Sequence, residues 1–240
     1  MKKPVAYFFL LAQLIPGTVF AGDYKMIVGK GIEACEAYLK NLNLFPNHPA
    51  MVCDRPVHPT LSELKKPDWR PVDIMQNLDL LRQVEQTLRR MTDAQWEAQK
   101  EQWAEKVKER VAKGWVSLST TELDVDRDGS VEIVVRYVNN VPPKCDPKNE
   151  SFYANPAGTE FFVLTPDQRG VDTLKSGNFN LLGGRHEIFL YKGRVYLTGW
   201  VGNLQFRNGE LWVTSPARLP GKDKQACKFA YKPAKQARNP

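Results

Sequence analysis

Residues Leu123–Val138 read LDVDRDGSVEIVVRYV, and this stretch decides how the rest of the chain is interpreted. It opens with three aspartates at alternate positions, which are Asp124, Asp126 and Asp128. Gly129 follows them, and a β-branched run begins at Val131. The pattern D-x-D-x-D-G is that of a calcium loop, but here it leads into a strand, whereas an EF-hand loop leads into a helix.

Carboxylates at alternate positions of a tight turn converge on one centre, and a glycine supplies the left-handed backbone that the turn needs. At about 5 Å and an effective dielectric of about 20, each pair of carboxylates repels by about 3 kcal/mol. A hard divalent cation would relieve this repulsion, with the Ser130 carbonyl in the seventh position and the Glu132 side chain in the ninth. Position twelve is Val135, which cannot act as a bidentate ligand. The sequence therefore predicts calcium held weakly, with a dissociation constant of about 0.1–1 mM.

The alternative is a polar β-turn that holds no metal. In that case Arg127 or a neighbouring lysine would neutralise the acids, and Asp124 would form an Asx turn. The loop resembles the calcium loops of integrin-type FG-GAP and VCBS repeats, in which D-x-D-x-D-G-x-x-[DE] also precedes a hydrophobic strand. The motif occurs once in this chain, so a propeller of such repeats is not predicted.

The N-terminus has the form of a secretory signal peptide. Lys2 and Lys3 precede an apolar run over residues 5–15. A cleavage site of the small-residue type follows, and cleavage is expected after Ala21. Cleavage would remove these two lysines and no acids, so the net charge of +7 would fall to +5. No later stretch has the length and apolar character of a membrane span. We therefore predict a periplasmic or secreted protein whose partner is a protein or an envelope component, and nucleic acid is not expected.

Four cysteines follow the predicted cleavage point, and they are Cys35, Cys53, Cys145 and Cys227. An even number in an exported chain predicts two disulfides, although three connectivities are possible. We favour Cys35–Cys53, which would close a short loop, and Cys145–Cys227, which would tie a proline-rich loop to the last strand. A four-cysteine zinc site is the alternative, but no C-x-x-C pair supports it.

Apolar residues recur at helical spacing in the first half of the chain. They predict a helix over residues 24–41, a second over 72–90, and a third that starts at the capping-box sequence Thr92–Gln95 and ends at Gly114. Residues 44–73 are rich in proline and predict an irregular, cysteine-bearing loop between the first two helices.

After Gly114 the apolar period changes to about two, which predicts strands. We expect them at residues 115–118, 131–138, 160–164 and 226–231, with a hairpin around Lys192-Gly193 and another around Asn208-Gly209. The fold class is therefore α+β, in which N-terminal helices pack with a C-terminal antiparallel meander. The expected organisation is a signal peptide at 1–21, a helical part at 22–113, a β part at 114–232 and a basic tail at 233–240, with 22–232 forming one compact unit.

The layout resembles that of uncharacterised exported bacterial proteins with a cysteine-bearing N-terminal helix, one D-x-D-x-D-G strand entry and a late F-x-Y-K-G-x-x-Y hairpin, here residues 189–196. This resemblance implies no activity. The chain contains no G-x-S-x-G elbow, H-E-x-x-H helix, Walker loop or dinucleotide fingerprint. The first hypothesis is a non-enzymatic binding or interaction protein with a structural calcium loop. The second is a periplasmic hydrolase that acts on cell-envelope material through the acidic loop and His186, and the third is a polyanion binder that uses the basic tail.

Overall fold

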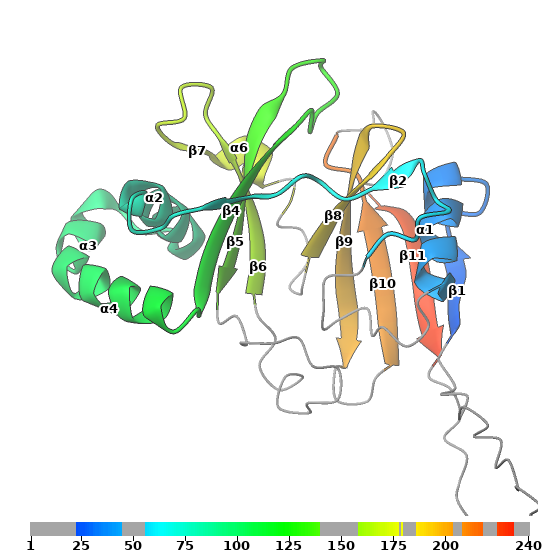
Figure 1. The fold of residues 1–240 in the computed structure, drawn as a ribbon, viewed down its shortest axis with the longest axis horizontal. Coiled ribbons are helices and arrows are strands. Elements are labelled where there is room, and N and C mark those ends of the chain that lie inside the picture. Colours follow the sequence, from blue (N-terminus) through cyan, green and yellow to red (C-terminus); the bar gives the residue numbers. More distant parts are fainter. Residues whose placement is uncertain are drawn as a thin grey trace, which may run out of the picture.

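The computed structural model describes residues 23–44, 56–139, 158–177, 179, 186–203, 208–217 and 225–232. These residues form two antiparallel sheets with helices outside them (Figure 1). The fold is thus α+β as predicted, but it has two sheets where one meander was expected. The helices are not confined to the N-terminal half either, since α6 (Thr173–Ser176) lies in the second half of the chain.

The first sheet has the strand order β1-β11-β10-β9-β8-β2, and the second has the order β3-β4-β5-β6-β7. The strands of the first sheet are β1 (Asp23–Val28), β2 (Leu64–Lys65), β8 (His186–Tyr191), β9 (Arg194–Asn203), β10 (Asn208–Thr214) and β11 (Gln225–Lys232). Those of the second are β3 (Arg70–Val72), β4 (Val116–Leu123), β5 (Glu132–Asn139), β6 (Gly158–Leu164) and β7 (Val171–Asp172). The segment between β2 and β3 passes from one sheet to the other (Figure 1).

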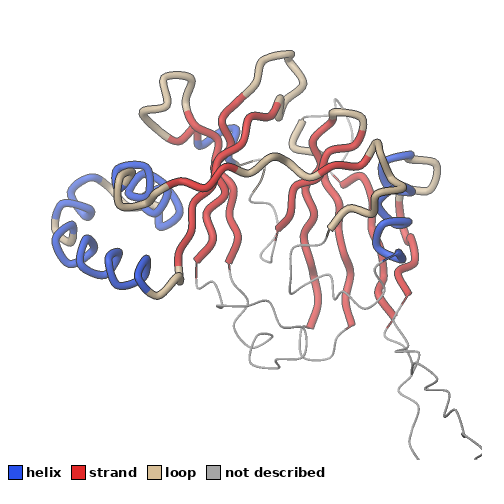
Figure 2. Tube along the Cα trace, in the orientation of Figure 1, coloured by secondary structure: helices blue, strands red, loops and turns tan. Residues whose placement is uncertain are grey.

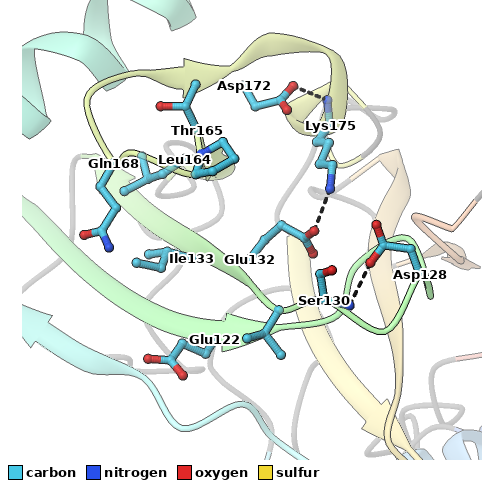
Figure 3. A pocket seen from close by; sticks show the side chains of 12 residues that line it. Glu122, Asp128, Ser130, Glu132, Ile133, Leu164, Thr165, Gln168, Asp172 and Lys175 are labelled. Carbon is cyan, nitrogen blue, oxygen red and sulfur yellow. Dashed lines mark hydrogen bonds and ion pairs between the residues drawn. The ribbon is translucent and has the colours of Figure 1, made fainter.

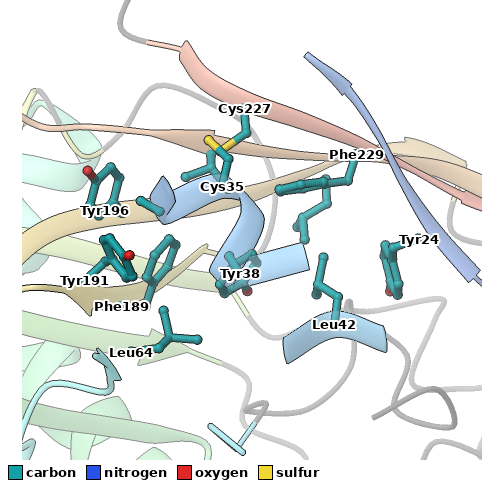
Figure 4. Packing of buried hydrophobic residues seen from close by; sticks show 13 residues of the cluster. Tyr24, Cys35, Tyr38, Leu42, Leu64, Phe189, Tyr191, Tyr196, Cys227 and Phe229 are labelled. Carbon is teal, nitrogen blue, oxygen red and sulfur yellow. A yellow bond between two sulfur atoms is a disulfide. The ribbon is translucent and has the colours of Figure 1, made fainter. Parts of the chain in front are cut away.

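The described residues form four layers, in which helices lie outside each of the two sheets and the sheets lie between them (Figure 2). Three hydrophobic clusters fill the spaces between successive layers. The helices α2 (Leu78–Arg89), α3 (Asp93–Glu97) and α4 (Lys100–Ala112) lie beside the second sheet. The middle cluster joins the two sheets through residues such as Phe161 and Leu197. On the far side, α1 (Glu33–Leu44) packs on the first sheet, where Tyr38 stacks on Phe189 with ring centroids 4.3 Å apart (Figure 4).

The predicted helix over 24–41 is wrong at its start, because residues 23–28 form strand β1 and the helix covers 33–44. Tyr24 is buried and Lys25 is exposed, and β1 pairs with β11 at the other end of the chain. Gly29 separates the two elements with φ +103°. A Cβ at this position would lie 2.8 Å from the Ala226 carbonyl oxygen and 3.0 Å from the Cys35 Sγ, so only glycine fits.

Both favoured disulfide pairings, Cys35–Cys53 and Cys145–Cys227, are also wrong. Cys35 on α1 is bonded to Cys227 on β11, across 192 residues of sequence (Figure 4). The prediction favoured short loops, whereas β1 and α1 fold back onto the last strand and bring the two ends of the chain together. Cys53 and Cys145 lie outside the described residues, as do the basic tail at 233–240 and the predicted signal peptide.

Several local predictions are confirmed. Thr92 caps α3 through a capping box with Gln95, and the hairpin at Lys192-Gly193 joins β8 to β9.

The helix predicted over 72–90 is shorter, at 78–89, because residues 70–72 pair with β4 instead. Asn208-Gly209 is not a turn, since both residues lie in β10, opposite Asn203 and Gly202. The connection between β9 and β10 falls at 204–207, outside the described residues.

A buried ionic network fixes the helices to the second sheet. The carboxylate of Glu85 on α2 is fully buried and accepts hydrogen bonds from Trp103 at 2.8 Å, Arg110 at 2.7 Å and the Tyr137 hydroxyl at 2.8 Å. Burial alone would raise the pKa of this carboxyl, but the hydrogen bonds from Arg110 and Trp103 hold the pKa below its ordinary value. The network therefore ties α2, α4 and β5 together around a charge that stays ionised.

Candidate cation-binding loop

The acidic loop joins β4 to β5, so the predicted relation between the loop and its two strands is confirmed. Val125 is 3% exposed and belongs to the cluster between the sheets, which anchors the loop from inside. Arg127 and Gly129 have positive φ values of 64° and 91°, and they turn the chain back toward β5. A hydrophobic anchor and two left-handed residues thus bring the alternating aspartates together.

The three aspartates converge as the sequence predicts. One carboxylate oxygen from each of Asp124, Asp126 and Asp128 lies within 4.8 Å of the others. Each carboxylate also accepts a backbone N–H of the loop, and the donors are Gly129 to Asp124 at 3.2 Å, Asp128 to Asp126 at 3.4 Å and Ser130 to Asp128 at 2.7 Å. The hydrogen bond from the Ser130 N–H lowers the pKa of Asp128, which favours its charged form.

The second oxygen of Asp124 is the observation that best fits a metal ion. Oδ2 of Asp124 accepts the Gly129 N–H, whereas Oδ1 is buried and has no hydrogen-bond partner among the described residues. A buried carboxylate oxygen without a donor is costly, and a hard cation would satisfy it. The three aspartates therefore offer the oxygen ligands that calcium prefers, from a loop of the right local form.

A lysine far along the chain already contacts this group. Lys175 on α6 places its Nζ 2.5 Å from Glu132 Oε1 (Figure 3). The same Nζ lies 2.8 Å from Asp126 Oδ2. The hydrogen bonds that the Lys175 ammonium donates to the Asp126 and Glu132 carboxylates raise the pKa of Lys175, so it stays charged. Asp172 caps the short helix by accepting the Lys175 backbone N–H at 2.8 Å. The alternative without a metal expected a neighbouring lysine to neutralise the acids. Lys175 contacts two of the acidic side chains, but it lies close to them in space and far from them in the sequence.

Glu132, the predicted ligand in position nine, has both oxygens engaged. Oε1 pairs with Lys175, and Oε2 accepts the Val125 N–H at 3.0 Å. The convergent group consists of the aspartates and does not include Glu132. Ser130 is exposed and donates its N–H to Asp128. The roles of Glu132 and the Ser130 carbonyl as ligands stay predictions.

Arg127 does not neutralise the aspartates. Its guanidinium donates from Nη2 to the hydroxyl of Ser215 at 3.0 Å, and Ser215 is buried just beyond β10. In the described part of the chain, Arg127 forms no ion pair with the three aspartates. The side chain instead ties the acidic loop of the second sheet to the end of the first.

A cavity of about 540 Å³ lies beside the loop. The start of β5 and the β6–β7 turn line it together with α6 (Figure 3). Ile133 and Leu164 contribute apolar side chains, whereas Glu122, Glu132 and Lys175 contribute charges. No sequence pattern indicates this cavity or the role of Lys175, because residues 171–184 carry only a glycine- and asparagine-rich pattern.

Comparisons with known proteins add no relative. No family model matches the chain, and no curated protein or solved structure is significantly similar to it. The acidic group is therefore present without a match to a named family. Among the described residues, no helix combines the length and apolar character that crossing a bilayer requires. Fold and site together define an α+β protein with one disulfide in its described part and an acidic group able to hold a metal ion.

Proposed function

We propose that the chain is an exported, non-enzymatic binding protein in which the acidic loop holds a structural calcium ion. The single observation that carries the proposal is the convergence of one carboxylate oxygen each from Asp124, Asp126 and Asp128 within 4.8 Å, with one buried oxygen of Asp124 left without a partner among the described residues. The signal-peptide pattern and the Cys35–Cys227 disulfide support an oxidising compartment, where calcium is abundant enough to fill a weak site.

The charge balance around the loop supports a further cation. Three aspartates and Glu132 bring four negative charges together, and Lys175 supplies one positive charge. Calcium would reduce the excess of negative charge that remains around the loop. Because Lys175 binds Asp126, calcium would compete with its ammonium for that carboxylate, and this competition would weaken the site.

The ion would act by stiffening the loop. The loop contacts the first sheet through Arg127 and Ser215, and α6 through Asp126 and Lys175. A filled loop would hold these elements at the mouth of the neighbouring cavity, where a protein or an envelope component could bind. Calcium at ten times its dissociation constant would raise the free energy of unfolding by about 1.4 kcal/mol.

Isothermal titration of calcium into the chain from residue 22 onward, with its disulfides oxidised, tests the proposal. We expect a dissociation constant of about 0.1–1 mM. Lys175→Met keeps the methylene stem and removes the ammonium, so it should tighten calcium binding about tenfold, which corresponds to about 1.4 kcal/mol. Asp126→Ala should abolish the heat.

Lys108→Met serves as the matched control, because Lys108 lies on an exposed face of α4 and pairs only with Glu105 there. It should leave calcium binding unchanged. Absence of heat with the wild-type chain and with Lys175→Met would contradict the proposal. Equal heat from wild type and Asp126→Ala would place the ion elsewhere.

A periplasmic hydrolase acting on cell-envelope material is the second candidate. The observation that favours it is the cavity, whose wall carries the carboxylates of Glu122, Glu132 and Asp172. The hypothesis from sequence also invoked His186, which opens β8 but whose side chain lies outside the described part. Release of soluble fragments from purified peptidoglycan, lost in Glu122→Gln, would favour this candidate over a binding protein.

A further inference from the structure

The cavity beside the acidic loop has the size and lining of a ligand site. Its volume of about 540 Å³ lies within the range of small-molecule pockets, which is about 300–1,000 Å³. It lies where β4, β5 and β6 extend toward the acidic loop, and the β6–β7 turn with α6 forms the opposite wall (Figure 3). The lining residues come from segments that are far apart in the sequence.

The charge of the lining indicates what kind of ligand fits. Four carboxylates line the cavity, and they belong to Glu122, Asp128, Glu132 and Asp172. Lys175 supplies the only ammonium among the lining residues, and it is already held by Glu132 and by Asp126. Glu122 forms no hydrogen bond or ion pair with the described residues, so its carboxylate is open to a ligand. The excess of negative charge favours a cationic ligand.

The apolar part of the lining indicates the shape of that ligand. Ile133 is half-buried and Leu164 is 7% exposed, and both lie between Glu122 and the β6–β7 turn (Figure 3). A short methylene chain would cover these side chains while its charged end remained among the carboxylates. A fully hydrated metal ion would gain nothing from this surface.

Lys175 shows how an alkylammonium group lies against these carboxylates. The side chain of Lys175 is a primary ammonium on a methylene stem, and it lies along one wall with its Nζ at Glu132 and Asp126. Figure 3 shows it extending from α6 toward the loop. The same carboxylate-rich site thus already holds an alkylammonium group in a defined position.

We propose that this cavity binds a ligand with a primary alkylammonium group on a short methylene stem. Glu122 is the residue that pairs with the ammonium, and Ile133 and Leu164 contact the stem. Such a group occurs on free diamines and polyamines and on lysine side chains of proteins. This inference goes beyond the calcium loop, since it concerns an organic cation and a different carboxylate.

Two probes distinguish the sources of the ammonium. We would titrate 1,5-diaminopentane and Nα-acetyl-lysine methylamide into the oxidised chain in EDTA, and follow binding by calorimetry and by NMR chemical shifts. Saturable binding of both probes would indicate a pocket that accepts a lysine side chain. Binding of the diamine alone would indicate a site for free amines. Because EDTA removes calcium, the outcome is independent of the loop proposal.

Charge variants separate the site from general attraction. Glu122→Gln should weaken binding of the diamine about fivefold or more through loss of one ion pair. Glu101→Gln removes the same charge from an exposed position on α4 and should leave the affinity unchanged. Binding of the diamine should change the NMR chemical shifts of Ile133 and Leu164. Neither variant should alter the melting temperature, because both side chains are exposed.

Three results would overturn the proposal. The first is the absence of saturable binding by either probe. The second is equal affinity of the wild type and Glu122→Gln, which would reduce the effect to general charge attraction. The third is binding of uncharged 1-pentanol as tightly as the diamine, which would show that the ammonium contributes nothing.

Discussion

Replacing Glu85 with alanine is the most direct test of how the helices are held on the second sheet. The carboxylate is 1% exposed and accepts from Trp103, Arg110 and Tyr137 at 2.7–2.8 Å. Its removal would leave the Arg110 guanidinium, whose side chain is only 18% exposed, without its partner acid. Breaking a buried pair in this way costs about 3–5 kcal/mol.

We expect Glu85→Ala to lower the free energy of unfolding by about 4 kcal/mol. Glu85→Gln keeps the shape and one acceptor oxygen, so it should cost about 2 kcal/mol. Equilibrium unfolding in urea, followed by tryptophan fluorescence and far-UV circular dichroism, would measure both values. Part of the fluorescence comes from the network, because the Trp103 indole donates to Glu85.

Glu101→Ala on the same helical layer is the control, since Glu101 is exposed and its replacement should change stability by less than about 0.5 kcal/mol. A loss below about 1 kcal/mol for Glu85→Ala would refute the reasoning. It would mean that the cost of burying the carboxylate cancels the energy of its hydrogen bonds.

Two further predictions concern acid and the disulfide. Because the folded pKa of Glu85 lies below the ordinary value of 4.5, its stabilisation is present above about pH 4.5 and is lost as the pH falls toward the folded pKa. Unfolding measured from pH 6 to pH 3 should therefore show a steeper loss for wild type than for Glu85→Gln, and parallel curves would contradict this. The Cys35–Cys227 bond spans 192 residues, so the double variant Cys35→Ser/Cys227→Ser should lose up to about 5 kcal/mol. Tryptic mapping of the unreduced wild type should give a cross-linked peptide pair with these cysteines, and a Cys35–Cys53 pair would contradict the structure.

Local features of the fold could be predicted because their causes are local. The capping box at Thr92 depends on residues three apart, and the Lys192-Gly193 hairpin depends on a two-residue turn between alternating strands. The acidic loop is also a feature with local causes. Its aspartates converge through loop hydrogen bonds and the left-handed backbone at Gly129.

Predictions that needed partners distant in the sequence failed. The prediction extends the apolar spacing over residues 32–42 back to Tyr24 as one helix, yet residues 23–28 form a strand that pairs with β11. The pairing of Cys35 was assigned by loop length, but contact between the chain ends decides it. Asn208-Gly209 is a common turn sequence, and here it lies within a ladder with β9 and β11.

The sequence by itself determined the class of the fold, the strand pair around the acidic loop and the three aspartates that converge in it. Only the tertiary structure decided that Lys175 lies against Asp126 and Glu132, and that a cavity forms between the loop and α6. The physical reason is the range of the forces involved. Backbone conformation and alternation act over a few residues, whereas an ion pair or a cavity wall depends on which distant segments the packed sheets bring together.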